Sequence, residues 1–277
     1  MELKDKERKL KELLKGMAPV VIAFSGGVDS SYLAYIAHEV LGDQALAVMA
    51  ESPSVPSHQY QIADRVIEQI GVAFKRIRSH ELDIDTYRAN PVNRCYYCKD
   101  ELFSRLETLA EEYASATILD GLNADDLNDF RPGRKAGEKH RVRSPLMEAG
   151  LTKEEIRELS RRAGLPTADL PASACLASRF PYGVSITEEK LHTVDEGEEY
   201  LREMGFRVYR VRHHDHLVRL EFGRKDLEKA LNPEIARRLA ERFKQLGFKY
   251  VTLDLEGYRT GSANEVLDST ETDPFTA

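Results

Sequence analysis

The stretch Val20-Val-Ile-Ala-Phe-Ser-Gly-Gly-Val-Asp-Ser30 decides the fold. Its first five residues are apolar, a run typical of a buried strand in a parallel sheet. Gly26 and Gly27 follow, and a helical pattern then extends from about Ser30 to Leu41, where Gly42 ends it. A strand, a glycine turn and a helix in this order form the first half of a βαβ unit, which implies a parallel sheet.

Strand and helix patterns continue to alternate after this unit. The expected strands cover 45–50, 72–77 and 117–120, and the expected helices cover 56–70 and 99–113. The sequence Thr152-Lys-Glu-Glu155 is a capping box and predicts the start of another helix. We therefore expect an α/β domain with a Rossmann-like parallel sheet over residues 1–180.

The pattern changes after Pro181. We expect helices over 187–204 and 232–247, a hairpin of strands 207–213 and 216–222, and a last strand over 250–255. These elements predict a smaller C-terminal α+β domain over residues 181–277, with a role in substrate binding or oligomerisation.

Composition excludes several classes of protein. The 277 residues include 40 Lys and Arg against 47 Asp and Glu, giving a formal net charge of −7, which argues against a surface built to grip nucleic acid. The sequence contains no run of 18 apolar residues, so no membrane span is predicted. The charged N-terminal stretch has no apolar segment of the kind found in signal peptides. We expect a cytoplasmic protein. Three cysteines exclude a disulfide scaffold.

The glycine turn has the composition of a phosphate site. Gly26 and Gly27 permit a close backbone approach, Ser25 and Ser30 add hydroxyl donors, and the following helix contributes the positive end of its dipole. A tight strand-to-helix turn without a ligand is the alternative. The turn lacks the Gly-Lys-Ser/Thr of a Walker motif and the G-x-G-x-x-G of a dinucleotide fingerprint.

Ser25-Gly-Gly-Val-Asp-Ser30 resembles the signature of the PP-loop ATP pyrophosphatases, which cleave ATP between the α- and β-phosphates and adenylate a substrate. The segment Ala47–Ser52 resembles the strand that lies near adenine in that superfamily. The resemblance implies ATP contacts from Ser25, Gly26, Gly27, Asp29, Ser30, Met49, Gly121, Asp129 and Arg131. Asp125, Asp126 and Asp129 are candidates to hold Mg²⁺ with the ATP, with solvated loop carboxylates as the alternative.

Four further motifs follow the PP-loop. They are Leu119–Gly133, Ala174-Cys-Leu-Ala-Ser-Arg-Phe-Pro-Tyr-Gly183, Tyr209-Arg-Val-Arg-His213 and Tyr250–Gly261. Together and in this order they resemble the LarE family, and the similarity extends to about residue 265. The resemblance implies an ATP-dependent sulfur transferase. Its substrate would be pyridinium-3,5-biscarboxylic acid mononucleotide, whose adenylated carboxylates become thiocarboxylates for the nickel-pincer nucleotide of lactate racemase.

The three cysteines distinguish branches of that family. In one branch only the cysteine matching Cys175 is present, and it gives up its own sulfur in a single turnover. Members that also have counterparts of Cys95 and Cys98 resemble proteins in which three thiolates hold a 4Fe–4S cluster, whose open iron can carry an extra sulfide. A persulfide at Cys175, a redox dithiol in Cys95-Tyr-Tyr-Cys98, a zinc site and inert thiols are the alternatives. We expect the C-x-x-C pair to lie just before a helix.

Basic residues for a small anionic substrate are expected locally, despite the net charge. Ser178 and Arg179 lie close to Cys175 in the sequence, and Arg210 and Arg212 alternate along a predicted strand, so that both point to one face. Solvated surface charge is the alternative for these arginines. His213-His-Asp-His216 could suggest a metal site, but its position predicts an ordinary hairpin turn.

Competing functions remain open at this point. A tRNA-thiolating PP-loop enzyme can also carry a cluster, although the acidic composition disfavours RNA. An amide-forming ligase of the NAD synthetase kind leaves the cysteines without a role, and a nucleotide-binding module without activity leaves the Cys and Arg motifs unexplained. The family resemblance implies a homo-oligomer, with a hexamer as the candidate assembly, and sulfide or another small donor as the sulfur source.

Overall fold

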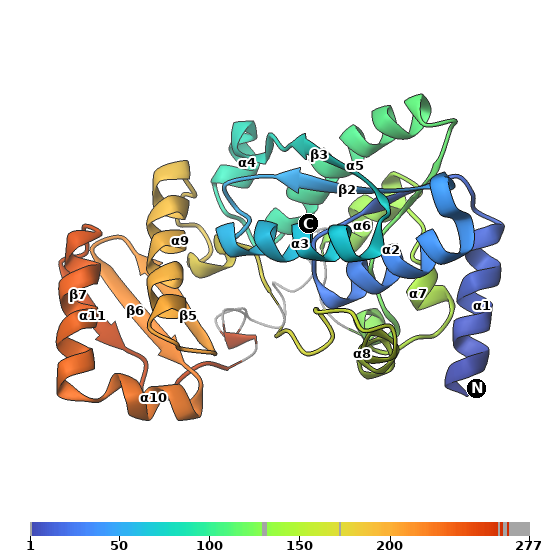
Figure 1. Ribbon diagram of the computed structural model, residues 1–277. Coiled ribbons are helices and arrows are strands. Elements are labelled where there is room, and N and C mark those ends of the chain that lie inside the picture. The colour runs from blue at the N-terminus through green and yellow to red at the C-terminus, as the bar shows by residue number, and fades with distance from the viewer. Residues whose placement is uncertain (1, 129–131, 172, 260, 263–264, 266–277) are drawn as a thin grey trace. The chain divides into compact units, whose positions relative to one another are not determined.

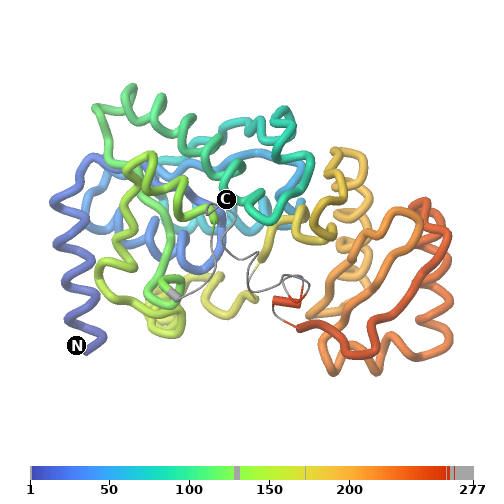
Figure 2. Tube along the Cα trace, turned by 180° about the vertical axis from the view of Figure 1, so that it is seen from behind, coloured from blue at the N-terminus to red at the C-terminus, as the bar shows by residue number. Residues whose placement is uncertain are grey.

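A computed structural model describes residues 2–128, 132–171, 173–259, 261–262 and 265 (Figure 1). The chain forms two compact units, each with its own sheet (Figure 2). Unit 1 consists of Met1–Ser52, His58–Glu81 and Asn93–Ser173, and unit 2 of Pro53–Ser57, Leu82–Val92 and Ala174–Ala277.

Unit 1 contains a four-stranded parallel sheet in the order β3-β2-β1-β4. The strands are β1 (Val20–Ala23), β2 (Ala45–Glu51), β3 (Ala73–Arg78) and β4 (Thr117–Leu119). Both neighbours of β1 run parallel to it, so its apolar side chains are buried on both faces of the sheet. The predicted parallel α/β fold is confirmed, and each strand ends within one residue of its expected position.

Helices cover both faces of this sheet. Those around it are α1 (Leu3–Lys15), α2 (Val28–Leu41), α3 (Ser57–Ile70), α5 (Arg94–Glu112), α6 (Gly133–Lys139), α7 (Pro145–Glu148) and α8 (Lys153–Arg162), with 3-10 turns η1 (Gly42–Gln44), η2 (Glu81–Asp83) and η3 (Ala124–Asn128). In the ribbon of Figure 1 and the tube of Figure 2, α5 and α6 lie on one face, and α2 and α3 lie on the other. The α8 capping box is confirmed, since Thr152 and Glu155 each bond the other's backbone N–H.

Helix α5 begins earlier than its sequence pattern indicates. Its buried residues Phe103 and Leu106 pack against Val21 and Val48 of the sheet, as the apolar periodicity requires. Tyr96 also packs against this cluster. The helix therefore extends back to Arg94, and the expectation that Cys95 and Cys98 precede the helix is wrong because they lie in its first two turns.

Unit 2 is built on a three-stranded mixed sheet in the order β5-β6-β7. Its elements are α4 (Asp85–Arg88), η4 (Leu176–Arg179), α9 (Glu188–Glu203), β5 (Tyr209–His214), β6 (Leu217–Phe222), α10 (Arg224–Ala230), α11 (Pro233–Gln245) and β7 (Tyr250–Leu253). The predicted hairpin is present as antiparallel β5 and β6, while β7 pairs parallel to β6. The apolar side chains Val211, Leu220 and Phe222 are buried, together with Phe243 from α11.

The division of the chain falls at 173/174, a few residues before the expected boundary at 180/181. Two short earlier segments also belong to unit 2. Backbone hydrogen bonds account for this difference: Leu176 N–H donates to the Ser54 carbonyl at 2.8 Å, and Ile186 N–H donates to the Arg88 carbonyl at 2.9 Å. Such pairings between distant parts of the chain leave no local signal in the sequence.

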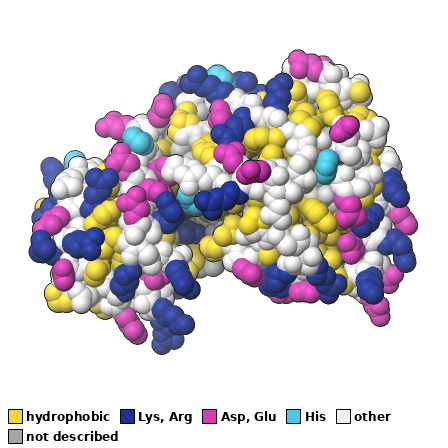
Figure 3. All heavy atoms as spheres, viewed as in Figure 1, with side chains coloured by type: hydrophobic (Ala, Val, Ile, Leu, Met, Phe, Trp, Pro, Cys, Tyr) yellow, Lys and Arg dark blue, Asp and Glu magenta, His cyan; other side chains and the backbone are white. Residues whose placement is uncertain are grey.

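Charged side chains of both signs are interspersed over the face drawn in Figure 3. Among the described residues, no helix combines the length and the apolar composition that crossing a membrane requires.

Gly197 in α9 is a packing-critical position of unit 2. A Cβ at this residue would lie 2.7 Å from the Phe243 ring, which is fully buried and cannot move aside. We expect Gly197→Ala to lower the free energy of unfolding by about 1–3 kcal/mol through overpacking, as measured by urea denaturation.

Gly137→Ala is the matched control, since it also changes a helical glycine. A Cβ there would have its nearest neighbours at 3.8 Å, an ordinary contact. Helix propensity then predicts a gain of up to about 1 kcal/mol in the free energy of unfolding. Equal destabilisation by the two changes would contradict the packing argument.

Candidate active site

The glycine loop lies at the point where the strand order of the parallel sheet reverses. From β1 the chain moves to β2 and β3 on one side, and then crosses to β4 on the other. Open α/β sheets bind ligands at the carboxyl ends of the strands beside such a switch point. The loop Ser25–Gly27 follows β1, and Asp120 and Gly121 follow the adjacent β4.

Hydroxyl groups order the loop from within. Ser30 Oγ accepts a hydrogen bond from Ser25 N–H at 3.2 Å and donates one to the Gly27 carbonyl at 3.2 Å. The Ser25 and Ser30 hydroxyl oxygens lie 3.1 Å apart. From α3, Gln59 Nε2 donates to the Ser25 carbonyl at 3.0 Å. The loop is therefore held in shape by its own serines and by one neighbouring helix.

Two glycines permit this geometry. Gly26 has φ +71°, and a Cβ there would lie 2.9 Å from Gln59 Nε2 and 3.2 Å from Ala63 Cβ. A Cβ on Gly121 would lie 3.2 Å from the backbone nitrogen of Ser30. The end of β4 thus passes directly beside the first turn of α2, where backbone N–H groups and the helix dipole favour an anion.

Lys153 supplies a cation that the loop motif itself lacks. Its Nζ forms an ion pair with Asp29 Oδ2 in the first turn of α2, and its backbone N–H donates to Asp125 Oδ2 at 2.8 Å. The capping box predicts the start of α8 but indicates no role for this lysine. Its 124-residue separation from Asp29 explains why sequence reasoning missed the contact.

Asp120 is the buried carboxyl group at the end of β4. Burial raises the pKa of Asp120, and hydrogen bonds from Ser144 Oγ at 2.6 Å and Leu122 N–H at 3.2 Å partly oppose this shift. The positive charge of Lys99 on α5 acts in the same opposing direction. Lys99 follows Cys98 directly, so helix α5 brings a basic side chain toward the carboxyl end of β4 from the C-x-x-C segment.

The other residues predicted to contact ATP or Mg²⁺ lie at different places in unit 1. Met49 is buried in β2, and Asp126 Oδ2 accepts the Asn123 N–H at 2.9 Å in η3. Asp129 and Arg131 lie outside the described residues. The structure therefore brings Ser25, Gly26, Gly27, Asp29, Ser30 and Gly121 together at the switch point.

The three cysteines carry thiols and not disulfides, and they belong to both units. Cys95 is exposed and Cys98 is half-buried on α5 of unit 1, while Cys175 is exposed in unit 2. A spacing of three residues places Cys95 and Cys98 on one side of the helix. Within each unit, the described residues contain no group of three His, Cys, Asp or Glu side chains arranged to hold a metal ion.

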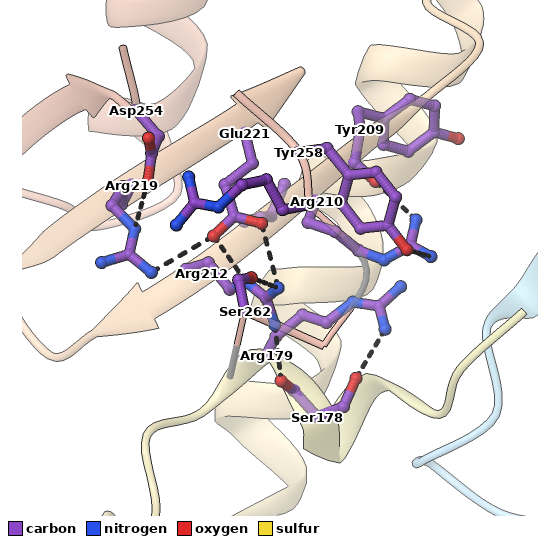
Figure 4. Close-up of polar contacts among 12 residues, drawn as sticks. Ser178, Arg179, Tyr209, Arg210, Arg212, Arg219, Glu221, Asp254, Tyr258 and Ser262 are labelled. Atoms are coloured by element: carbon purple, nitrogen blue, oxygen red, sulfur yellow. Dashed lines mark hydrogen bonds and ion pairs between the residues drawn. The ribbon is translucent and has the colours of Figure 1, made fainter. Parts of the chain in front are cut away.

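In unit 2 two of the predicted arginines, Arg179 and Arg212, are engaged in buried ion pairs, and Figure 4 shows the pair of Arg212 with Glu221. Arg212 forms a two-bond pair with Glu221, both at 2.9 Å, and donates from Nη1 to the Ser178 carbonyl at 2.8 Å. Arg179 makes a similar pair with Glu198, at 2.8 and 2.9 Å. Glu198 and Glu221 were missed by sequence reasoning because nothing in their local sequence distinguishes them from exposed carboxylates.

Arg210 and Arg212 lie on the same face of β5, as their alternation predicts. Figure 4 shows Arg210 beside Tyr258, and its guanidinium carbon is 4.7 Å from the centre of that ring. Burial and the nearby charge of Arg179 lower the pKa of Arg210. On this face Arg179 and Arg212 are paired with buried carboxylates, while Arg210 lies against the Tyr258 ring in a partly desolvated environment, where electrostatic interactions are stronger than in water.

The expected hairpin turn is present but shorter than predicted, because His213 and His214 are the last residues of β5 and only Asp215 and His216 form the turn. It joins β5 to β6, and Asp215 adopts φ +53° there. His213 packs between the rings of Phe180 and Phe248, both at 5.1 Å between ring centres. Burial lowers the pKa of His213 to about 4, so this imidazole is neutral near pH 7 and acts as part of the core.

Similarity to known proteins extends over the whole chain. The family model of NAD synthase matches residues 4–104. The chain is 36% identical over 276 residues to the pyridinium-3,5-bisthiocarboxylic acid mononucleotide synthase of Lactiplantibacillus plantarum, covering 99% of each chain. The chain belongs to the LarE family. It is also 42% identical over 265 residues to the uncharacterized protein slr1717 of Synechocystis, covering 96% of this chain and 99% of that one.

A more distant relative matches about two thirds of the chain. A chain of the glutamine-hydrolyzing GMP synthase of Archaeoglobus fulgidus is 25% identical over 203 residues, covering 66% of this LarE homologue and 64% of the relative. The loop at the switch point of unit 1 thus belongs to a superfamily of ATP-dependent enzymes.

Gly26 tests the loop geometry of this LarE homologue. Gly26→Ala adds a methyl group within 2.9 Å of Gln59, in a backbone conformation that alanine disfavours. We expect ATP affinity, measured by isothermal titration calorimetry, to fall by about tenfold to a hundredfold.

Gly42→Ala is the control for backbone strain alone. Gly42 has φ +55°, and a Cβ there would have no neighbour within 4 Å. ATP should bind to this variant as it does to the unaltered chain. Unchanged ATP affinity in Gly26→Ala would show that the loop does not contact the nucleotide.

Proposed function

We propose that this LarE homologue is an ATP-dependent sulfur transferase acting on pyridinium-3,5-biscarboxylic acid mononucleotide. The observation that carries the proposal is the 36% identity over 99% of both chains to a protein named pyridinium-3,5-bisthiocarboxylic acid mononucleotide synthase. Converting the two carboxylates to thiocarboxylates yields the product in that name. The product serves the nickel-pincer nucleotide cofactor of lactate racemase.

The first step is the adenylation of a carboxylate. A carboxylate oxygen of the substrate attacks the α-phosphorus of ATP, the bond to the β-phosphate oxygen breaks, and pyrophosphate leaves. Ser25, Gly26, Gly27, Asp29 and Ser30 are the proposed pyrophosphate residues, with Lys153 as an additional cation. Backbone N–H groups and a fixed positive charge stabilise the negative charge that develops on the leaving group.

Other groups complete the proposed nucleotide site. Met49 of β2 lies on the side proposed for adenine, and Gly121, Asp129 and Arg131 are the remaining proposed ATP contacts. Mg²⁺ would accompany the ATP. The oxygen ligands available for it in the loop after β4 are Asp125, Asp126 and Asp129, a donor set of the kind that Mg²⁺ prefers.

The second step is the displacement of AMP by sulfur. A sulfur nucleophile attacks the carbonyl carbon of the acyl adenylate, the bond to the AMP oxygen breaks, and a thiocarboxylate and AMP result. Sulfur anions are strong nucleophiles near neutral pH, and AMP is a far better leaving group than an oxide. Cys175 is the proposed catalytic cysteine, because it lies in the Ala174–Gly183 motif and has an exposed thiol.

We propose that Cys95, Cys98 and Cys175 hold a 4Fe–4S cluster. The chemistry of the donors fits this group, since all three are thiols, none is fully buried, and thiolates are the usual ligands of such clusters. When bound, the cluster would supply an iron without a protein ligand, where an additional sulfide can be held. Loss of sulfur from Cys175 itself, in a single turnover, is the alternative source.

The substrate carries a phosphate and two carboxylates, so its proposed binding residues are basic. Ser178, Arg179, Arg210 and Arg212 form this set, and guanidinium groups bind carboxylate and phosphate oxygens in pairs. We further propose a cytoplasmic homo-oligomer, with a hexamer as the candidate assembly, that takes sulfide or another small sulfur donor and does not bind nucleic acid.

Pyrophosphate release separates the two steps. With ATP and the pyridinium dicarboxylate nucleotide, we expect Cys175→Ala to release pyrophosphate within about twofold of the unaltered chain, because adenylation needs no thiol. Thiocarboxylate formation, followed by mass spectrometry, should fall by about a hundredfold or more. Cys175→Ser is the isosteric control and should behave like Cys175→Ala.

Two results would contradict this assignment. If the unaltered chain binds ATP but releases no pyrophosphate when the nucleotide is added, the substrate assignment fails. If Cys175→Ala forms thiocarboxylate at the unaltered rate, Cys175 has no role in sulfur transfer.

The cluster is tested by purification without oxygen. We expect the unaltered chain to contain iron and acid-labile sulfide and to absorb in the visible range, whereas Cys95→Ala loses most of its iron because only two thiolates remain. Tyr97→Phe, which leaves all three thiols in place, should keep its iron. An iron-free protein that still forms thiocarboxylate over many turnovers would overturn the cluster and leave the sulfur transfer intact.

A further inference from the structure

The backbone around Cys175 is held at several points although its thiol is exposed. The Cys175 carbonyl oxygen accepts hydrogen bonds from Ser178 N–H at 3.0 Å, from the Ser178 hydroxyl at 2.8 Å and from Arg179 Nη1 at 3.2 Å. On the other side of the peptide, Leu176 N–H donates to the Ser54 carbonyl at 2.8 Å. The thiol therefore projects from an immobilised turn.

The Arg179 guanidinium links this turn to the rest of unit 2. All three of its nitrogens are engaged: Nε and Nη2 donate to Glu198, and Nη1 contacts the carbonyls of Ala174 and Cys175 and the Ser178 hydroxyl. The residue is only 3% exposed. The Arg179 guanidinium is therefore bonded to protein atoms at every nitrogen. This arrangement suits a structural role better than the binding of an anionic ligand.

Glu198 provides the anchor for this clamp. It projects from α9, is 3% exposed, and accepts the Val211 N–H of β5 at 3.1 Å in addition to its bonds from Arg179. Burial acts to raise the pKa of Glu198, but the Arg179 charge and hydrogen bonds hold it below its usual range, so the pair stays ionised. Removing one partner of a buried pair leaves the other charge uncompensated.

We propose that Arg179 is a positioning residue for Cys175, acting through Glu198-anchored hydrogen bonds to the backbone on both sides of the thiol. In this role Arg179 acts on Cys175 and does not need to touch the substrate, which refines its place among the proposed substrate-binding residues. Arg212, which donates to the Ser178 carbonyl, supports the same turn from β5. The inference rests on Cys175 as the sulfur-handling residue of the proposed function.

The test measures the turn and the thiol directly, without sulfur transfer. In the full chain with Cys95→Ser and Cys98→Ser, Cys175 is the only remaining thiol. Two quantities are recorded: amide hydrogen exchange over 174–180, and the ratio of the Cys175 alkylation rates with anionic iodoacetate and neutral iodoacetamide. The ratio reports positive charge at the thiol and is insensitive to loss of fold elsewhere.

We expect Arg179→Gln to speed hydrogen exchange of the Ser178 amide by about tenfold. The Ser178 N–H donates to the Cys175 carbonyl, and this carbonyl loses its hydrogen bond from the Arg179 guanidinium in the variant. The alkylation ratio should fall by about threefold as the positive charge is removed. Arg179→Lys keeps the charge but cannot reproduce the forked contacts, so it should retain the ratio and still speed exchange. Arg202→Gln is the control on α9, since it removes an exposed arginine that pairs locally with Glu199, and it should change neither quantity.

Three outcomes overturn the proposal. Folded Arg179→Gln with unchanged exchange over 174–180 shows that the clamp does not hold the turn. Restoration of both quantities by Arg179→Lys shows that charge alone is sufficient. Unfolding of unit 2 in both Arg179 variants assigns the residue to the stability of the whole unit. The alkylation and exchange results stand whether or not the sulfur transferase assignment succeeds, so failure of one is distinguishable from failure of the other.

Discussion

The parallel pairing of β1 with β2 on one side and β4 on the other is the constraint on which the proposed nucleotide site depends. It places the loop after β1 beside the residues that follow β4, close enough that a Cβ on Gly121 would lie 3.2 Å from the backbone nitrogen of Ser30. Helix α8 then completes the arrangement, because Lys153 reaches Asp29 from a distant part of the sequence. A shift of β4 by one residue in register would separate these groups and reverse the faces of its side chains.

Unit 2 uses a different kind of constraint. It contains two buried arginine–carboxylate pairs, Arg179 with Glu198 and Arg212 with Glu221. The arginine of each pair donates a hydrogen bond to the backbone of the turn that bears Cys175. Desolvating such charges is unfavourable, and apolar residues in their place often give a more stable protein. Their hydrogen bonds are directional and therefore fix the position of the turn's backbone more precisely than apolar contacts would. The pairs are therefore better explained by precision at this turn than by stability.

Local patterns in the sequence were sufficient for much of unit 1. The apolar runs predicted the four strands, and the turn after Val20–Phe24 predicted the position of the loop, because both depend on residues close together in the chain. The start of α5 was misjudged because Tyr96 packs against the sheet core, a tertiary contact without a local signature. The partners Lys153, Glu198 and Glu221 could not be found because single charged residues on helices and strands are usually solvated.

The discontinuous composition of the two units also bears on how the protein folds and evolves. The chain passes from one unit to the other at 52/53, 57/58, 81/82, 92/93 and 173/174. Neither unit is a single continuous piece that gene fusion could add or remove intact. Synthesis must proceed past residue 173 before the segments 53–57 and 82–92 meet the rest of their own unit, so unit 2 cannot complete its fold while the ribosome is still producing unit 1. Cys95 and Cys175 lie two or three residues after the last two of these boundaries, 92/93 and 173/174. Both thiols are therefore close to connections that the two units share.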